Sequence, residues 1–133
     1  MTYPVTTIAD LGDGYFRKVR QELGITAFGV NAIVVPVGGE GIRHYHSSQD
    51  ELYFVHRGTA VFEVDGNRFE LGEGGFCHVP STTHRWFANA GDTELQIVVI
   101  GGKDGYVGRD GHLVDEADLA KRQAISSSGQ PPS

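Results

Sequence analysis

The chain has 133 residues, 39% of them hydrophobic, which is enough for one compact core and too little for two ordinary domains. Its formal charge of −6 argues against a nucleic acid or an anionic membrane as partner, because both attract basic surfaces. We therefore expect one domain whose partners are small molecules.

The cysteine content and the N-terminal residues bear on the compartment. Cys77 is the single cysteine, so no internal disulfide can form. The first residues lack the basic and then apolar pattern of a secretory signal. Apolar runs such as residues 97–100 are far shorter than the ~20 residues that a membrane helix needs. We expect a soluble, cytoplasmic protein.

The chain begins with a segment that has no sustained periodicity. Residues 1–14 mix proline, threonine, aspartate and glycine, and we predict an N-terminal coil there. Residues 15–22 and 26–35 carry β-branched and aromatic residues and are separated by Leu23 and Gly24, which predicts two strands joined by a turn. These strands open a β-structured domain, which we place over residues 15–101.

A glycine-rich connection over residues 36–41 leads to two histidines, His44 and His46. Side chains two residues apart on a strand share a face, about 7 Å apart along the backbone, so both imidazoles can converge on one ion. After a polar turn, Glu51 can add a carboxylate oxygen to the same centre. Asp50 is the alternative carboxylate, but it lies in the turn and on the opposite strand face, so we prefer Glu51.

The strands that follow are short and separated by glycine-rich turns. An alternating stretch places Ala60, Phe62 and Val64 on the inward face, and Asp65 with Gly66 tolerates the positive φ values of a tight hairpin. We predict strands over residues 51–56, 59–64, 68–71, 76–79, 84–88 and 95–100. Eight or so short strands with such turns indicate an all-β sandwich or barrel.

The end of the chain has a different character. Residues 101–111 are rich in glycine and predict a loop over the barrel. Asp115 can cap a short helix over residues 115–125, which has acidic residues in its first turn and basic residues in its last. We therefore expect residues 102–125 to form a loop and a short helix packed on the barrel, and residues 126–133 to form a disordered tail.

A fourth candidate ligand is His84, which follows a strand and the turn at Pro80. Three histidines and one glutamate use four positions of an octahedral ion and leave two for water, dioxygen or a bidentate substrate. Structural zinc sites are normally closed, so open positions point to catalysis. We predict one divalent transition metal, and these ligand types accept Fe, Mn, Zn or Ni alike.

The spacing of the first cluster resembles that of the cupin superfamily. Gly38, five residues, His44-x-His46, four residues, Glu51, six residues and Gly58 match every fixed position of the first cupin motif.

The second cupin motif is matched in part. Gly74, Pro80 and Asn89 fit its spacing, whereas Thr82 stands where cupins usually have glycine and His84 lies one residue closer to the proline. The resemblance implies a double-stranded β-helix jelly-roll barrel, here with a short C-terminal helix, and the homodimer that is usual in the family.

Strand phase supplies further candidates for the pocket. Tyr53 shares the face of Glu51, so we expect it to orient substrate or to pass a proton. Phe62 and Trp86 are candidates for substrate binding by phase, and Asn31 and Gln96 are candidates because they are polar residues inside otherwise apolar strands. The two aromatic side chains can equally pack in the core, and the two amides can equally satisfy backbone groups.

Strand phase also bears on the substrate. It places Arg43 and Arg85 away from the histidines and leaves only Arg57 on the face of Glu51. This favours a small, mostly apolar or aromatic, metal-chelating substrate over a phosphosugar. The resemblance to cupins then implies a metal-dependent enzyme, with dioxygenase-type oxidation as the leading reaction. The alternatives are a redox-neutral isomerase or decarboxylase, and a cupin module that binds a small ligand without turnover.

Overall fold

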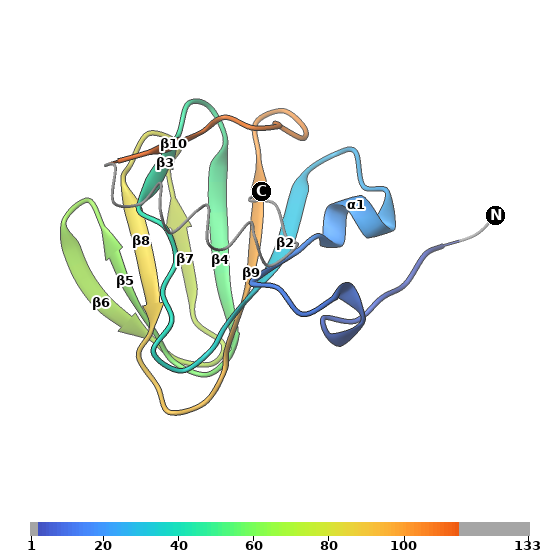
Figure 1. Ribbon diagram of the computed structural model, residues 1–133. Helices are drawn as coiled ribbons and strands as arrows, with labels where there is room; N and C mark the ends of the chain where they lie inside the picture. The colour runs from blue at the N-terminus through green and yellow to red at the C-terminus, as the bar shows by residue number, and fades with distance from the viewer. Residues whose placement is uncertain (1–2, 115–133) are drawn as a thin grey trace.

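The computed structural model describes residues 3–114, which form two five-stranded antiparallel sheets that face each other (Figure 1). The first sheet consists of β1 (Phe16–Arg17), β2 (Gly29–Val35), β9 (Leu95–Gly102), β4 (Asp50–Arg57) and β7 (Phe76–Val79), in that order. The second consists of β10 (Gly111–Leu113), β3 (His44–His46), β8 (Arg85–Asn89), β5 (Ala60–Val64) and β6 (Asn67–Leu71). This is the predicted all-β jelly roll.

Two short helical segments precede the main strands. They are η1 (Ala9–Leu11) and α1 (Val19–Leu23). The prediction of a strand over residues 15–22 is wrong beyond β1, because the helix-forming run before Gly24 closes a turn of helix. Gly24 ends α1 with φ 70° and donates its N–H to the carbonyl of Arg20. Figure 1 shows α1 beside β2.

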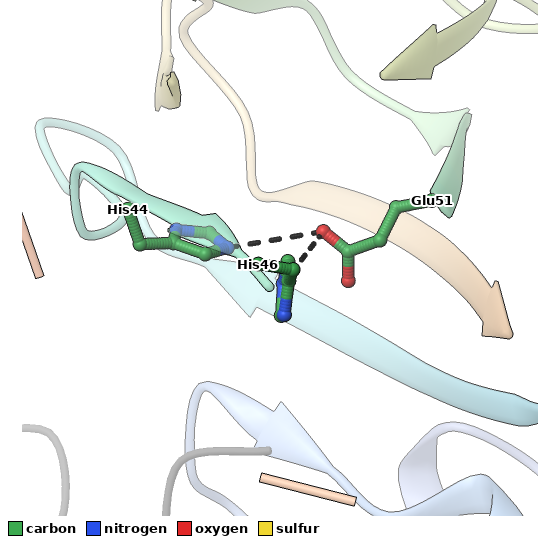
Figure 2. Close-up of side chains that lie close together, drawn as sticks. All are labelled: His44, His46 and Glu51. Atoms are coloured by element: carbon green, nitrogen blue, oxygen red, sulfur yellow. Dashed lines mark ion pairs between the residues drawn. The ribbon is translucent and has the colours of Figure 1, made fainter. Parts of the chain in front are cut away.

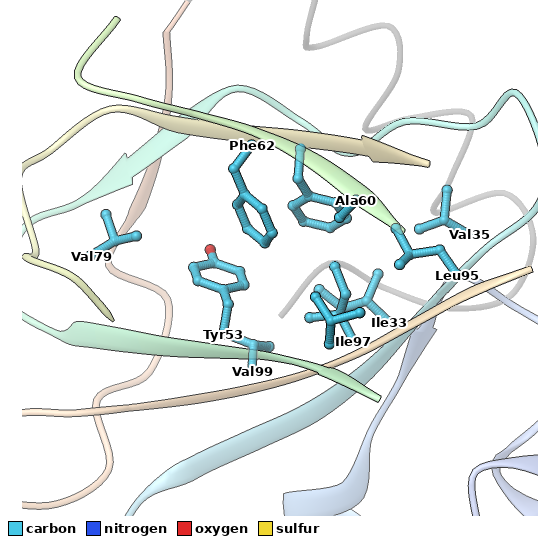
Figure 3. Packing of buried hydrophobic residues seen from close by; sticks show 11 residues of the cluster. Ile33, Val35, Tyr53, Ala60, Phe62, Val79, Leu95, Ile97 and Val99 are labelled. Atoms are coloured by element: carbon cyan, nitrogen blue, oxygen red, sulfur yellow. The ribbon is translucent and has the colours of Figure 1, made fainter. Parts of the chain in front are cut away.

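The core lies between the inner faces of the two sheets (Figure 3). Register aligns Ile33 of β2 and Val55 of β4 on either side of Ile97 of β9, and all three side chains are buried. On the opposite sheet Phe62 is fully buried, as predicted, and pairs with Phe87. Because inward side chains alternate with outward ones along each strand, the core residues fix which polar side chains also point inward.

One irregularity changes the phase at the end of β4. The pairing of β4 with β9 shifts register between Val55 and Arg57, and Arg57 is exposed. The prediction that Arg57 shares the face of Glu51 is therefore wrong, since a bulge of this kind turns the following residue outward.

The predicted loop near the end of the chain is shorter than expected. The strand β9 continues to Gly102 and β10 starts at Gly111, so the loop between them spans residues 103–110. The helix predicted over residues 115–125 and the tail over 126–133 lie outside the described residues. Within residues 3–114 the structure has no helix with the length and apolar character needed to cross a bilayer.

Two glycines with positive φ offer a test of the turns that hold this fold. Gly58 has φ 84°, and a Cβ added there would lie 2.9 Å from the carbonyl oxygen of Glu94. Gly66 has φ 79°, and a Cβ there would meet nothing within 4 Å.

We predict that Gly58→Ala lowers the free energy of unfolding by ~2–4 kcal/mol, because it adds a clash with backbone to the cost of left-handed φ. Gly66→Ala carries only the conformational cost and should lower it by about 1 kcal/mol. Urea unfolding of both variants measures the difference. Equal losses would show that the close approach of Gly58 to Glu94 is not needed.

Candidate metal centre

Three side chains from the two sheets meet near one end of the barrel (Figure 2). His44 and His46 come from β3, and Glu51 comes from β4 of the facing sheet. Their candidate ligand atoms all lie within 4.8 Å of one another. The Glu51 Oε1 atom lies 3.1 Å from His46 Nε2 and 3.8 Å from His44 Nε2. The residues predicted from spacing therefore do converge.

The two imidazole rings are held with their Nδ1 atoms turned away from the centre. His44 Nδ1 lies 2.8 Å from the carbonyl oxygen of Ile42, which can only accept, so His44 carries its proton on Nδ1. His46 Nδ1 lies 2.8 Å from Oδ1 of Asp110. With its proton on Nδ1, each ring directs Nε2 toward Glu51. His46 Nε2 is buried and has no hydrogen-bond partner in the described structure.

This donor set fits a divalent transition metal. Two neutral imidazoles and one carboxylate are ligands that such ions prefer, and a metal would satisfy the buried His46 Nε2. The hydrogen bonds at both Nδ1 atoms are the outer contacts that orient histidine ligands in metal sites. His44, His46 and Glu51 can therefore hold a metal ion.

Asp110 is a member of the site that the sequence reasoning missed. It lies in the loop before β10, accepts from His46, and also accepts the backbone N–H groups of Ser48 and Gln49 at 2.9 Å each. Burial opposes the charged form, but the hydrogen bonds from Gln49, Ser48 and His46 outweigh it and hold the pKa of Asp110 below its usual range. No local pattern marks Asp110, because 64 residues separate it from His46.

Glu51 is nearly enclosed between the sheets and is compensated on several sides. Burial would raise its pKa, but the close approach and the charges of His44 and His46 outweigh burial and hold the pKa of Glu51 well below its usual range. The Tyr53 hydroxyl donates to Glu51 Oε1 at 2.7 Å, and Arg85 Nε lies 3.7 Å from the same oxygen. Burial and the charge of Glu51 raise the pKa of Tyr53 well above its usual value, so its hydroxyl stays protonated.

The pKa of His46 reflects the same cluster. Burial alone would lower it, but the close approach of Glu51 Oε1 to Nε2, the charge of Glu51 and the hydrogen bond of Nδ1 to Asp110 together raise the pKa of His46 above its usual value. Without a metal, His46 is therefore prepared to hold a proton between two carboxylates. A bound cation would take the place of that proton.

His84 does not join this group, which corrects the prediction of a fourth ligand. Its side chain is exposed and stacks on Tyr45, with ring centroids 5.0 Å apart. The register pairs His44 with Arg85, so Arg85 takes the inward position that was predicted for His84. Arg85 is 1% exposed and donates to the carbonyl oxygens of Val79, Pro80 and Ser81.

Arg85 points inward, so the prediction that it points away from the histidines is wrong. The departure from the second cupin motif was the available signal: His84 lies one residue closer to Pro80, so its side chain falls on the opposite face of the strand, and Arg85 takes the inward position. Asp50, the alternative carboxylate, lies outside the cluster. It accepts the Ser81 N–H at 3.0 Å and faces His78 on the surface.

Of the predicted substrate residues, the structure brings only Asn31 to a cavity beside Glu51. Phe62 is packed in the core against Tyr53 and Phe87. Trp86 lies on the other face of β8 from Arg85, where the guanidinium groups of Arg43 and Arg68 lie over its ring. Gln96 donates to Glu94 on the surface. Strand phase, the basis for choosing Phe62 and Trp86, did not separate core from cavity.

Two cavities meet at His46 and Glu51. The outer cavity has a volume of about 230 Å³ and is lined mainly by polar and charged groups from α1, β2, β9 and the loop before β10. The inner cavity, about 70 Å³, reaches between the sheets and is lined by His44, Tyr53 and apolar side chains such as Ile33 and Phe87. The candidate metal centre therefore borders both a polar and an apolar space.

Comparison with known proteins finds one similar curated sequence and many solved structures of similar fold. An uncharacterized protein of Methanocaldococcus jannaschii is 29% identical over 65 residues, which are 49% of this chain and 52% of that protein. The chain thus spans about half the length of this curated relative. A cupin protein from Bacteroides fragilis superposes with a TM-score of 0.67 at 20% identity, covering 77% of this chain and 86% of that one.

A second solved structure, a sugar phosphate isomerase from a cupin superfamily of Silicibacter pomeroyi DSS-3, has a TM-score of 0.61 at 26% identity. The match covers 66% of this chain and 58% of that one. The family model of the cupin domain matches residues 32–101, which contain His44, His46 and Glu51 and make up more than half of the sequence. The chain belongs to the cupin family.

Proposed function

We propose that this cupin is a metal-dependent enzyme that acts on a small molecule, with His44, His46 and Glu51 as the metal ligands. One observation carries the proposal: two imidazole Nε2 atoms and a carboxylate oxygen converge within 4.8 Å at the meeting point of two cavities. A closed structural site would need a fourth protein ligand, and the group of three leaves positions for a substrate.

Dioxygenase-type oxidation of a metal-chelating substrate is the reaction that this donor set supports best. Two histidines and one carboxylate with open positions are typical of non-haem Fe(II) oxygenases. Bound Fe(II) would supply oxygen activation, whereas Mn, Zn or Ni would supply Lewis-acid polarisation for redox-neutral chemistry.

The protein's own residues hold the ligands in place. Asp110 fixes the ring of His46 through Nδ1, and the carbonyl of Ile42 does the same for His44. We propose that Tyr53 acts on Glu51, because its protonated hydroxyl donates to Oε1 and so fixes the carboxylate. Asn31 lines the outer cavity and is the remaining candidate for a hydrogen bond to substrate.

A redox-neutral isomerase or decarboxylase is the second candidate. The buried guanidinium of Arg85 beside Glu51 favours it, because an inward cation suits a phosphorylated or carboxylated substrate. The likeness to a sugar phosphate isomerase at 26% identity points the same way. A cupin that binds a ligand without turnover is the third. The homodimer and the cytoplasmic location stay predictions.

We predict that the purified protein binds about one transition-metal ion and that His46→Ala abolishes this binding, because the variant loses one of three ligands. Elemental analysis of untagged protein prepared without chelator measures the metal. His78→Ala, which removes an exposed histidine paired with Asp50, is the control and should keep the metal. A His46→Ala protein with full metal content would refute the assignment.

Asp110→Asn should weaken metal binding about 10- to 100-fold without preventing it, because the amide no longer provides the charged acceptor that orients His46. Competition with a chromophoric chelator gives the affinity. Asp92→Asn, at an exposed position away from the site, should leave the affinity unchanged. Equal affinities in all three proteins would mean that the Asp110 contact does not support the ligand.

The reaction type is tested by oxygen uptake. We expect the Fe(II)-loaded protein to consume dioxygen with a chelating substrate from a panel of aromatic diols and keto acids, and Glu51→Ala to show no uptake. Turnover of a substrate without oxygen uptake, in Mn-, Zn- or Ni-loaded protein, would instead support the isomerase or decarboxylase. Thermal stabilisation by a compound that is never converted would support a ligand-binding cupin.

A further inference from the structure

The outer cavity beside the candidate metal centre gathers basic side chains from distant parts of the chain. Lys18 and Arg20 come from the start of α1, and Arg109 comes from the loop between β9 and β10. Figure 1 shows that α1 stands beside β2 and that this loop lies at the same end of the barrel as the turn between β3 and β4. His46 and Glu51 line the same cavity.

Two of these three cationic side chains have no polar partner among the described residues. Neither Lys18 nor Arg109 makes a side-chain hydrogen bond or ion pair with any of residues 3–114 in the contacts that the structure shows. Arg20 already has partners, because it donates to the carbonyl of Ile25 and its guanidinium lies 3.8 Å from the centre of the Tyr106 ring. Two side chains in the cavity thus keep their full capacity to bind an anion.

The acidic residues of the cavity do not neutralise them. Glu51 already faces His44, His46 and Tyr53, and Asp110 accepts from His46, Ser48 and Gln49. A protein with a formal charge of −6 repels anions on average, so basic groups gathered in one cavity set this place apart from the rest of the surface.

The backbone at Arg109 adds a separate observation. Its φ is 52°, in the left-handed region. Glycine adopts this conformation without steric cost, whereas it costs an arginine about 1 kcal/mol or more. Gly108 precedes it and Gly111 follows two residues later. A long cationic side chain therefore stands at a loop position that suits glycine, and that side chain lines the cavity.

We propose that the outer cavity binds the anionic group, a phosphate or a carboxylate, of a small substrate, with Lys18 and Arg109 as the principal contacts. This assignment rests on the proposed function, in which the other end of the same molecule reaches the ion held by His44, His46 and Glu51. At about 230 Å³ the cavity admits a molecule of a few carbon atoms beside its anionic group, and the inner cavity of about 70 Å³ admits one small apolar substituent.

The expected substrate therefore becomes a small anion. Strand phase alone favoured a mostly apolar or aromatic compound, because Arg57 was the one cation expected on the face of Glu51. With Arg85 behind Glu51 and two unpaired cations in front of it, charge selects an anion and the size of the inner cavity excludes a large ring.

The test measures binding of inorganic phosphate and of malonate to metal-free protein by titration calorimetry at low ionic strength. Each of Lys18→Gln and Arg109→Gln should weaken binding about 10-fold, the order expected for one charge-assisted hydrogen bond, and the double variant should weaken it further. Lys103→Gln removes the same charge from an exposed position in the same loop and should bind as the parent protein does. Preference for phosphate or for malonate identifies which anionic group the cavity takes.

Zinc binding by equilibrium dialysis separates this inference from the proposed function. If zinc binds to all variants while neither anion binds, or both anions bind equally to parent and double variant, the anion cavity is refuted and the metal centre stands. If zinc does not bind while the double variant loses phosphate or malonate, the anion cavity stands and the metal-dependent function fails. Zinc binding by the double variant also shows that its site is folded.

Discussion

The burial of the Glu51 carboxylate between two sheets is the constraint on which the rest of the site depends. A carboxylate removed from water costs several kcal/mol unless charge and hydrogen bonds replace the solvent. Here Tyr53 donates from the same strand, His44 and His46 approach from the facing sheet, and Arg85 lies behind. Each of these residues is placed by strand register, so the packing of the core and the chemistry of the site are not separable.

The second carboxylate, Asp110, ties this centre to the connection between β9 and β10. Through His46 it touches the ligand set, and through Ser48 and Gln49 it holds the turn that leads to Glu51. The same loop carries Arg109 into the outer cavity. The orientation of His46 and part of the charge at the cavity mouth are therefore set by the adjacent residues Asp110 and Arg109.

The sequence predicted the site residues whose positions depend on local strand alternation, and missed those that distant segments bring together. His44, His46 and Glu51 were predictable because period-two alternation and one short turn decide their faces locally. His84 was misplaced because it stands one residue before the inward position that Arg85 takes, and Arg57 because a bulge changes the phase of its strand. Asp110, Lys18 and Arg109 could not be foreseen, since only the fold brings the N-terminal helix and the last loop to one end of the barrel.

The sign of the charges at the site follows from these long-range contacts rather than from composition. An acidic chain would be expected to favour neutral or cationic ligands, yet the groups that face the candidate ion from outside are basic, and the carboxylates beside it are occupied by histidines, tyrosine and backbone N–H groups. Over the few ångströms of a cavity, local charges are much less screened than the surface charges beyond a Debye length of ~8 Å. The charges that line the cavity are therefore a better guide to the ligand it would take than the net charge of the chain.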